Sequence, residues 1–171
     1  MSQSHDTFLA SISDATALLE LYSTREKATP EELEVLKRAG LIMAFTAWET
    51  YVEDRITEAV IPQLKLLEGC QLGKFMKARL DEELKRFNNP NSDKTRKLFL
   101  DYTGIDVTAC WRWNNFDPAG AKKQLDTWIG IRGEVVHRSL EGGARTIKKD
   151  DLRKVISFLT ELASATEKAL D

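Results

Sequence analysis

The sequence predicts an all-α protein, a helical bundle of four to five main helices with additional short helices. Apolar residues recur at steps of three and four along most of the chain, and no segment has the strict alternation of a half-buried strand. Leucine, isoleucine, valine and phenylalanine make up 44 of the 171 residues. This share exceeds the roughly 20% below which charged chains tend to stay disordered. With this length and no low-complexity linker, we expect one domain over residues 1–171.

The first helix is expected near the N-terminus. An apolar stripe with helical spacing predicts it: Phe8, Ile12, Ala15, Leu19 and Tyr22. His5 precedes this stripe, and we expect it to lie in a disordered start.

A long second helix is expected from Thr29 toward Pro62. Thr29 can accept from the unbonded amides of the first turn, Pro30 suits the first helical position, and Glu32 completes a capping box. One face of this helix carries small residues, which would let a neighbouring helix approach closely. These are Gly40, Ala44 and Ala47.

The middle of the chain predicts a third helix over 72–87, which ends before a break at 88–91. Ser92 or Asp93 is expected to cap a short helix that stops at Gly104.

The least regular segment, 105–116, contains Trp111 and Trp113. Their rings could stack on nucleic-acid bases, although tryptophans beside a helix start more often close the edge of a core.

Two further helices are expected in the C-terminal third. Asp117 and Pro118 provide a cap and a first-turn proline for one helix, and a loop follows at 141–143. Asp150 and Asp151 suit the first turn of the last helix because of its dipole. The stripe of the first of these helices consists of Ala121, Leu125, Trp128, Ile129 and Arg132, and the core face of the last consists of Leu152, Val155, Ile156, Leu159, Leu162 and Leu170.

Composition and charge exclude several classes of protein. A formal net charge of −2 excludes a protein that binds nucleic acid through bulk charge, although a local basic patch stays open. Cys70 and Cys110 are far apart in sequence and form no CxxC motif. We therefore expect two free thiols in a protein of a reducing compartment. No signal peptide is indicated, and the most apolar run, 41–45, is far shorter than a membrane span. We therefore expect a cytoplasmic protein without a membrane partner.

Few residues are available for metal or nucleophilic catalysis. The chain has two histidines, which excludes a histidine-rich metal site. HExxH, P-loop, GxSxG and GxGxxG motifs are absent. A magnesium site made only of carboxylates stays open, although no acidic spacing singles one out. The sequence predicts no metal and no cofactor.

Arg132 and His137 form the one pair with a clear chemical interpretation. A histidine can take a proton from a ribose 2′-hydroxyl or give one to a leaving oxygen, and an arginine can stabilise charge on phosphorus. Five residues of a regular helix separate the two by about 140°, so they do not share a stripe. They could converge if the helix ends near His137 or if the long arginine side chain bridges the angle. One histidine cannot readily be base and acid at once, whereas a two-fold dimer would supply both. The alternative is structural: His137 bonds the last carbonyls of its helix, and Arg132 forms a surface ion pair.

Several stretches carry a resemblance to a known family, and together they cover most of the chain. They are residues 8–21, 41–53, 89–92, 97–99, 103–105 and 125–132, followed by His137. In their order and spacing they resemble the HEPN superfamily of small helical domains, and within it the RiboL-PSP-HEPN branch.

The resemblance implies a HEPN-like fold and a metal-independent endoribonuclease. The motif of that family is an arginine, four to six intervening residues and a histidine, which Arg132 and His137 match with four between. Members with the motif act as homodimers, line a shared cleft with the paired motifs, and leave a 2′,3′-cyclic phosphate or a 3′-phosphate. Gly133 departs from the polar residue, often asparagine, that follows the arginine in many members. This glycine could mark a weakened site, or could loosen the helix so that the pair converges.

Other residues are expected to support such a site. Glu49 lies on an otherwise apolar helix, where a buried carboxylate needs a partner, and Arg132 is the natural one. The alternative is that Glu49 faces solvent beside Glu53. The basic residues best placed to hold RNA phosphates are Arg138, Arg145, Lys148 and Lys149.

The sequence and the resemblance together predict a dimeric HEPN ribonuclease, a toxin or phage-defence effector that cleaves RNA by transesterification. RNA and a second copy are its expected partners, and an antitoxin is a further one. Two alternatives stay open: a non-catalytic HEPN dimerisation or regulatory module, for which Gly133 is an argument, and a plain helical adaptor.

Overall fold

Six α-helices and one short 3-10 helix form the secondary structure of the residues that the computed structural model describes, which are 1–25, 29–137 and 146–170. Within these ranges, the isolated β-bridge between Trp113 and Phe116 is the only strand-like pairing. The predicted all-α fold is confirmed. The elements are α1 (Gln3–Thr24), α2 (Pro30–Lys65), α3 (Gln71–Leu84), α4 (Ser92–Thr103), η1 (Val107–Cys110), α5 (Pro118–His137) and α6 (Lys149–Leu170).

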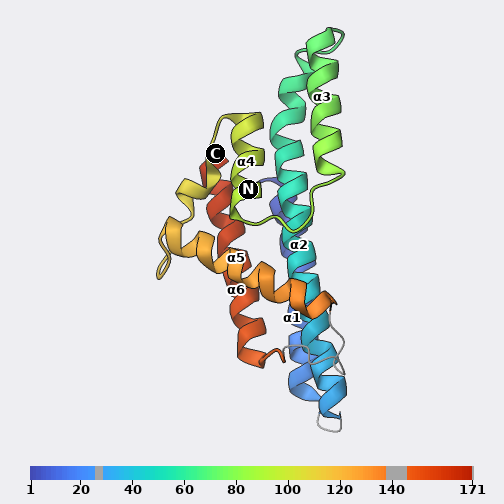
Figure 1. Cartoon of the computed structure of the whole chain (residues 1–171), viewed down its shortest axis with the longest axis vertical. Helices are drawn as coiled ribbons and strands as arrows, with labels where there is room; N and C mark the ends of the chain where they lie inside the picture. Colours follow the sequence, from blue (N-terminus) through green and yellow to red (C-terminus); the bar gives the residue numbers. More distant parts are fainter. Residues whose placement is uncertain (26–28, 138–145, 171) are drawn as a thin grey trace.

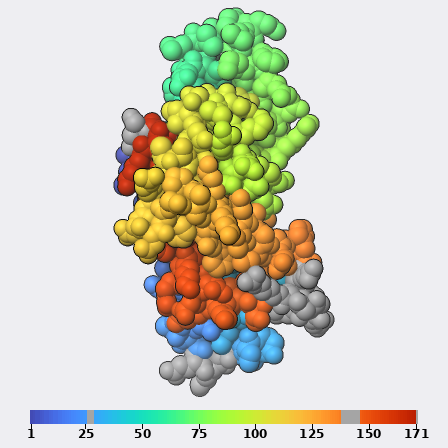
Figure 2. Space-filling model, turned by 60° about the vertical axis from the view of Figure 1, so that its left-hand side comes forward, coloured from blue at the N-terminus to red at the C-terminus, as the bar shows by residue number. Residues whose placement is uncertain are grey.

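Helix α2 is the axis around which the other helices are arranged (Figure 1). It has 36 residues, which at 1.5 Å per residue makes it about 54 Å long. Helices α1 and α6 pack along it, α3 folds back against its C-terminal end, and α5 crosses it. The α2–α3 hairpin projects beyond the rest of the molecule (Figures 1 and 2).

The predicted start of α2 is confirmed in detail. The amide of Glu32 donates to Thr29 Oγ1 at 3.2 Å, and the amide of Thr29 donates to Glu32 Oε2 at 2.9 Å. Pro30 is the first helical residue. Pro62 lies inside the helix, which continues to Lys65 and so ends later than expected.

The ends of α4 follow the expected chemistry with one change of residue. The cap is Asn91, not Ser92 or Asp93, because Asn91 Oδ1 accepts from the amide of Lys94 at 2.9 Å. Gly104 ends the helix as expected, in the left-handed conformation with φ 74°.

The predicted close approach at the small residues of α2 is confirmed at Gly40. A Cβ placed there would lie 2.8 Å from a methyl carbon of Leu152, which belongs to α6. The core around this contact consists of rings and aliphatic side chains from all the long helices, and its largest fully buried members are Trp48, Trp111, Tyr51, Phe8 and Phe99. Trp111 is 0% exposed and donates from Nε1 to Thr166 at 2.9 Å. It therefore cannot stack on bases.

A buried ion pair joins the ends of the chain to α2. Glu167 accepts from Arg55 Nε at 2.9 Å, from the Tyr51 hydroxyl at 2.8 Å and from the amide of Ser2 at 3.1 Å. Burial alone would raise the pKa of Glu167, but the hydrogen bonds from Tyr51 and Ser2 and the charge of Arg55 hold it below its ordinary value of 4.5. The carboxylate thus stays charged and ties α6 and the start of α1 to α2.

The prediction that His5 lies in a disordered segment is wrong. Ser2 caps α1 by accepting from the amide of His5 at 3.1 Å, and Glu58 of α2 accepts from the amides of Gln3 and Ser4. His5 is 2% exposed and lies against the rings of Phe8 and Tyr51, each at a centroid distance of 6.3 Å. Neither ring nitrogen of His5 has a hydrogen-bond partner among the described residues.

Replacing His5 by phenylalanine should stabilise the protein. The substitution keeps a ring in the same space and removes two buried polar atoms that make no hydrogen bond, for an expected gain of about 1 kcal/mol. In a chain of this length the gain corresponds to a rise in melting temperature of about 2–4 °C, measured by circular dichroism. The matched control is His137→Phe at the exposed end of α5, which should change stability by less than about 0.5 kcal/mol. A lower melting temperature for His5→Phe alone would show that the imidazole nitrogens are needed.

Replacing Glu167 by glutamine should destabilise the protein at neutral pH, by about 3 kcal/mol, because Arg55 loses its buried counter-charge. The folded-state pKa of Glu167 lies below its unfolded value, so its stabilisation is present above pH 4.5 and is lost as the pH falls through the folded-state pKa. The difference between wild type and variant in urea unfolding should therefore shrink below pH 4.5. Glu161→Gln, exposed on the same helix, is the control. A difference that does not change with pH would contradict the assignment.

Candidate functional site

Arg132 is held in place by the segment between α3 and α4. Its side chain is half-buried, and Nη1 donates to Asn89 Oδ1 at 2.5 Å. Its Nε is buried and has no partner within the described ranges. Among the described residues Arg132 forms no ion pair, unlike in the structural alternative, and its Nε is an unused donor.

Asn89 has a backbone conformation that suits this role. Its φ is 47°, which makes it the one non-glycine residue with positive φ in the described part of the chain. Asparagine tolerates this left-handed conformation better than most residues. In it, the Asn89 amide donates to Glu49 Oε2 at 2.9 Å while the side-chain oxygen accepts from Arg132. One residue thus connects α2 to α5.

The neighbours of Asn89 fix this segment further. Trp48 Nε1 donates to the carbonyl of Pro90 at 3.0 Å, from a fully buried ring. On the other side, the amide and hydroxyl of Ser92 both donate to the carboxylate of Asp126, each at 2.8 Å. The segment is therefore bonded to α2 through Trp48 and Glu49, and to α5 through Asp126 and Arg132.

The expected role of Glu49 takes an indirect form. No ion pair joins Glu49 to Arg132 in the described ranges, and the two side chains bind opposite sides of Asn89 instead. Glu49 is half-buried and does not simply face solvent. Its charge still acts on Glu53: burial raises the pKa of Glu53, and the charges of Glu49 and Asp54 raise it further.

His137 is the last residue of α5, and its side chain is exposed. The His137 side chain makes no hydrogen bond with any other described residue, so it does not bond the carbonyls of its own helix end. Arg132 points into the protein at Asn89, whereas His137 lies about 140° around the helix from it. On a regular helix this separation places the two side chains on different faces.

Arg38 is a residue of this region that sequence reasoning missed. Its Nη2 donates to the carbonyl of Val135 at 2.5 Å, across 97 residues of sequence. The contact places a cation from α2 at the last turn of α5, the turn that carries His137. A cation there offsets the partial negative charge of the helix end. Sequence periodicity alone could not indicate this pairing, because it depends on where α5 crosses α2.

The structure describes two of the four residues that were predicted to bind phosphate. Arg138 and Arg145 lie outside the described residues. Lys148 is exposed just before α6, and Lys149 is half-buried with its Nζ 5.7 Å from the centre of the Tyr22 ring. Lys149 therefore contacts α1, while Arg132 contacts the α3–α4 segment.

The described ranges contain no cluster of three or more histidine, cysteine, aspartate or glutamate side chains able to hold a metal ion. A search of the described helices finds none that is long and apolar enough to cross a membrane.

A comparison with protein families decides the relationship of the chain. A family model described as RiboL-PSP-HEPN matches residues 9–171, nearly the whole sequence. The chain belongs to the RiboL-PSP-HEPN family. The resemblance inferred from the sequence is thereby confirmed, and the all-helical fold agrees with it. No protein with a curated description and no solved structure matches the chain.

Gly133, the departure from the HEPN pattern, is not required by packing. A Cβ built at Gly133 would meet no heavy atom within 4 Å, so a side chain would fit there. The φ of Gly133 is not positive, so the backbone does not require glycine either.

The Asn89–Arg132 contact should be measurable as a coupling free energy. Asn89→Gly suits the positive φ and keeps the amide bond to Glu49, so it removes only the side-chain acceptor. Urea unfolding of Asn89→Gly, Arg132→Gln and the double variant should give a coupling of about 1 kcal/mol, reduced from the value of a buried charged hydrogen bond because Arg132 is partly exposed. The matched pair Arg79→Gln and Asn89→Gly should be additive, because Arg79 is on α3 and pairs with Glu82. Additive effects for Arg132 as well would show that the contact contributes nothing.

Proposed function

We propose that this HEPN protein is a metal-independent endoribonuclease that cleaves RNA in a cleft between two copies of the chain. One observation carries the proposal: α5 holds an arginine oriented by Asn89 and, five residues later, an exposed histidine with no hydrogen-bond partner in the described part of the chain. These are the two groups that transesterification without a metal requires.

The reaction follows from the chemistry of the two side chains. His137 of one copy takes the proton of the ribose 2′-hydroxyl, and O2′ attacks the adjacent phosphorus. The phosphorus–O5′ bond breaks, O5′ takes a proton from a second imidazole, and a 2′,3′-cyclic phosphate remains. Arg132, whose charge is fixed at all physiological pH values, stabilises the additional negative charge on the phosphorane.

The proposed reaction calls for two copies of the chain. One imidazole cannot act as base and acid at once, and on a regular helix Arg132 and His137 lie on different faces. A two-fold axis near the end of α5 would bring the histidine of one copy to the arginine of the other and would supply the second imidazole. A toxin or phage-defence role, with an antitoxin as partner, is consistent with such a ribonuclease.

Gly133, which departs from the HEPN pattern, favours one alternative, a non-catalytic HEPN module that serves dimerisation or regulation. The same dimer would form in that case, without cleavage. Activity therefore has to be measured directly, and oligomeric state alone does not separate the two functions.

Purified wild-type protein should cleave total RNA in excess EDTA, and His137→Ala should abolish cleavage. Arg132→Ala should reduce the rate by at least about a hundredfold, because it removes the charge that stabilises the transition state. The matched control is Arg79→Ala, on α3 and away from α5, which should cleave like wild type. Product ends should carry cyclic phosphate or 3′-phosphate.

Equal cleavage by wild type and His137→Ala would refute the assignment of the site. Absence of cleavage by all variants, together with a dimer in sedimentation analysis, would favour the non-catalytic module.

A further inference from the structure

A groove with aromatic walls lies on the opposite side of α5 from Asp126 and His137. Its volume is about 520 Å³, within the range of small-molecule sites. The walls come from three places: the turn at 113–116, the α5 residues Gln124 and Trp128, and α6 from Arg153 to Glu161. Figure 2 shows the stretch before α5 and helix α6 next to each other on one face.

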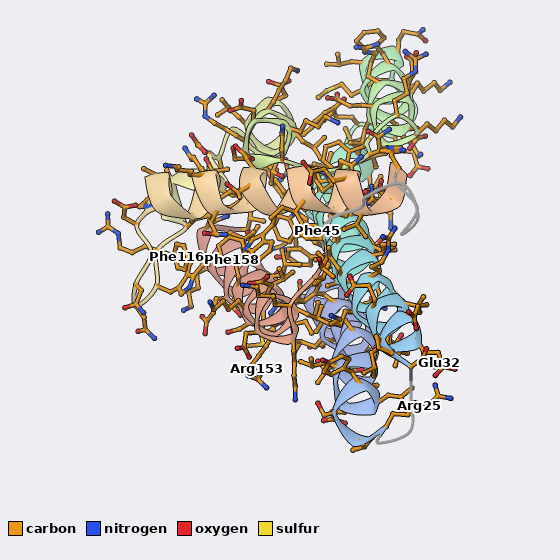
Figure 3. All side chains as sticks on the ribbon, turned by 60° about the horizontal axis from the view of Figure 1, so that its bottom comes forward. Arg25, Glu32, Phe45, Phe116, Arg153 and Phe158 are labelled. Atoms are coloured by element: carbon orange, nitrogen blue, oxygen red, sulfur yellow. The ribbon has the colours of Figure 1, made fainter. Side chains whose placement is uncertain are left out.

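The ring system of the groove is built around a tight turn. Trp113 and Phe116 bond to each other through two backbone hydrogen bonds, at 3.1 and 2.6 Å, and their rings are 5.1 Å apart. Phe158 of α6 lies 5.5 Å from Trp113 and 5.3 Å from Phe116. Figure 3 shows Phe116 and Phe158 side by side beneath α5. Because Phe158 is buried while Trp113 and Phe116 are only half-buried, the latter two present ring surface to the groove.

The polar side chains at the groove are of the kinds that bind an unpaired nucleotide. The side-chain amides of Asn114, Asn115 and Gln124 line the groove and make no hydrogen bond with other described residues. They and the exposed Glu161 can donate to or accept from the edge of a base. Lys154 is exposed and forms no ion pair in the described ranges, whereas Arg153 shares its charge with exposed Asp150 at 3.0 Å. The ammonium group of Lys154, which has no ion-pair partner there, could bind one phosphate beside the rings.

We propose that this groove binds an unpaired base of an RNA strand, with Trp113 stacking on the base and Lys154 contacting its phosphate. The choice of RNA as the source of the base rests on the proposed function. The groove does not include the two proposed catalytic residues: along α5, Gln124 lies about 20 Å from His137 and on a different side of the helix, while Trp128 lies one turn before Arg132. Bound there, a flanking base would favour single-stranded RNA over duplex, because the base must be out of a stack to enter.

The test uses the full chain carrying His137→Ala, so that RNA is not cleaved during binding. Affinity for a short, fluorescently labelled single-stranded RNA is measured by anisotropy, and the same sequence in duplex form is measured in parallel. Trp113→Ala and Lys154→Glu should each weaken binding of the single strand about tenfold. Trp113→Phe should restore most of the affinity, because a ring is again present.

Matched controls are Phe75→Ala and Lys74→Glu, an exposed ring and an exposed lysine on α3, which should leave affinity unchanged. Melting temperatures of all variants separate loss of binding from loss of fold, and Lys154→Glu, at an exposed position, keeps the test valid if Trp113→Ala unfolds. Unchanged affinity of both folded groove variants would overturn the inference, as would duplex binding that depends equally on Trp113.

The two proposals fail in different ways. If wild type cleaves RNA but the groove variants bind normally, the cleavage site stands and this inference is refuted. If binding depends on Trp113 and Lys154 but no variant cleaves, the groove stands and the nuclease proposal is refuted.

Discussion

The segment between α3 and α4 is the constraint on which the candidate site depends. It is bonded on one side to α2, through Trp48 and Glu49, and on the other side to α5, through Asp126 and Arg132. Asn89 occupies the centre in a left-handed conformation, which costs free energy in a non-glycine residue and persists only where surrounding contacts require it. The orientation of Arg132 is therefore set by the packing of two helices and does not depend on its own rotamer preference alone.

Helix α2, which contacts the α3–α4 segment, is itself held in place by contacts with the rest of the core. The same helix carries Gly40, which admits Leu152 of α6, and Arg55, which pairs with Glu167 near the C-terminus. A helix of 36 residues would bend or shift if it were packed along only part of its length. The buried ion pair and the close contact at Gly40 fix α6 and α1 against it, so the position at which α5 crosses is defined with respect to the whole core.

Local features were predictable from the sequence, and contacts between distant segments were not. The capping box at Thr29, the end of α4 at Gly104 and the apolar stripes depend on residues a few positions apart, so sequence spacing carries the signal. The Asn89–Arg132 and Arg38–Val135 contacts span 43 and 97 residues. The direct pairing of Glu49 with Arg132 that the sequence suggests is not observed, because Glu49 bonds the Asn89 backbone amide and Arg132 bonds the Asn89 side chain. His5 was misjudged because closeness to a chain end suggests disorder, whereas Glu58 holds that end.

The charge distribution limits how RNA could approach a HEPN dimer of this chain. Glu49 and Glu53 lie on α2, where burial raises the pKa of Glu53 and the neighbouring charges of Glu49 and Asp54 raise it further. These carboxylates would repel a phosphate that came from the α2 side. At the last turn of α5, by contrast, Arg38 offsets the negative end of the helix dipole beside His137. Arg38 thus weakens the repulsion that a phosphate would meet at the C-terminal end of α5, and the proposed dimer would have to place the two α5 ends opposite each other.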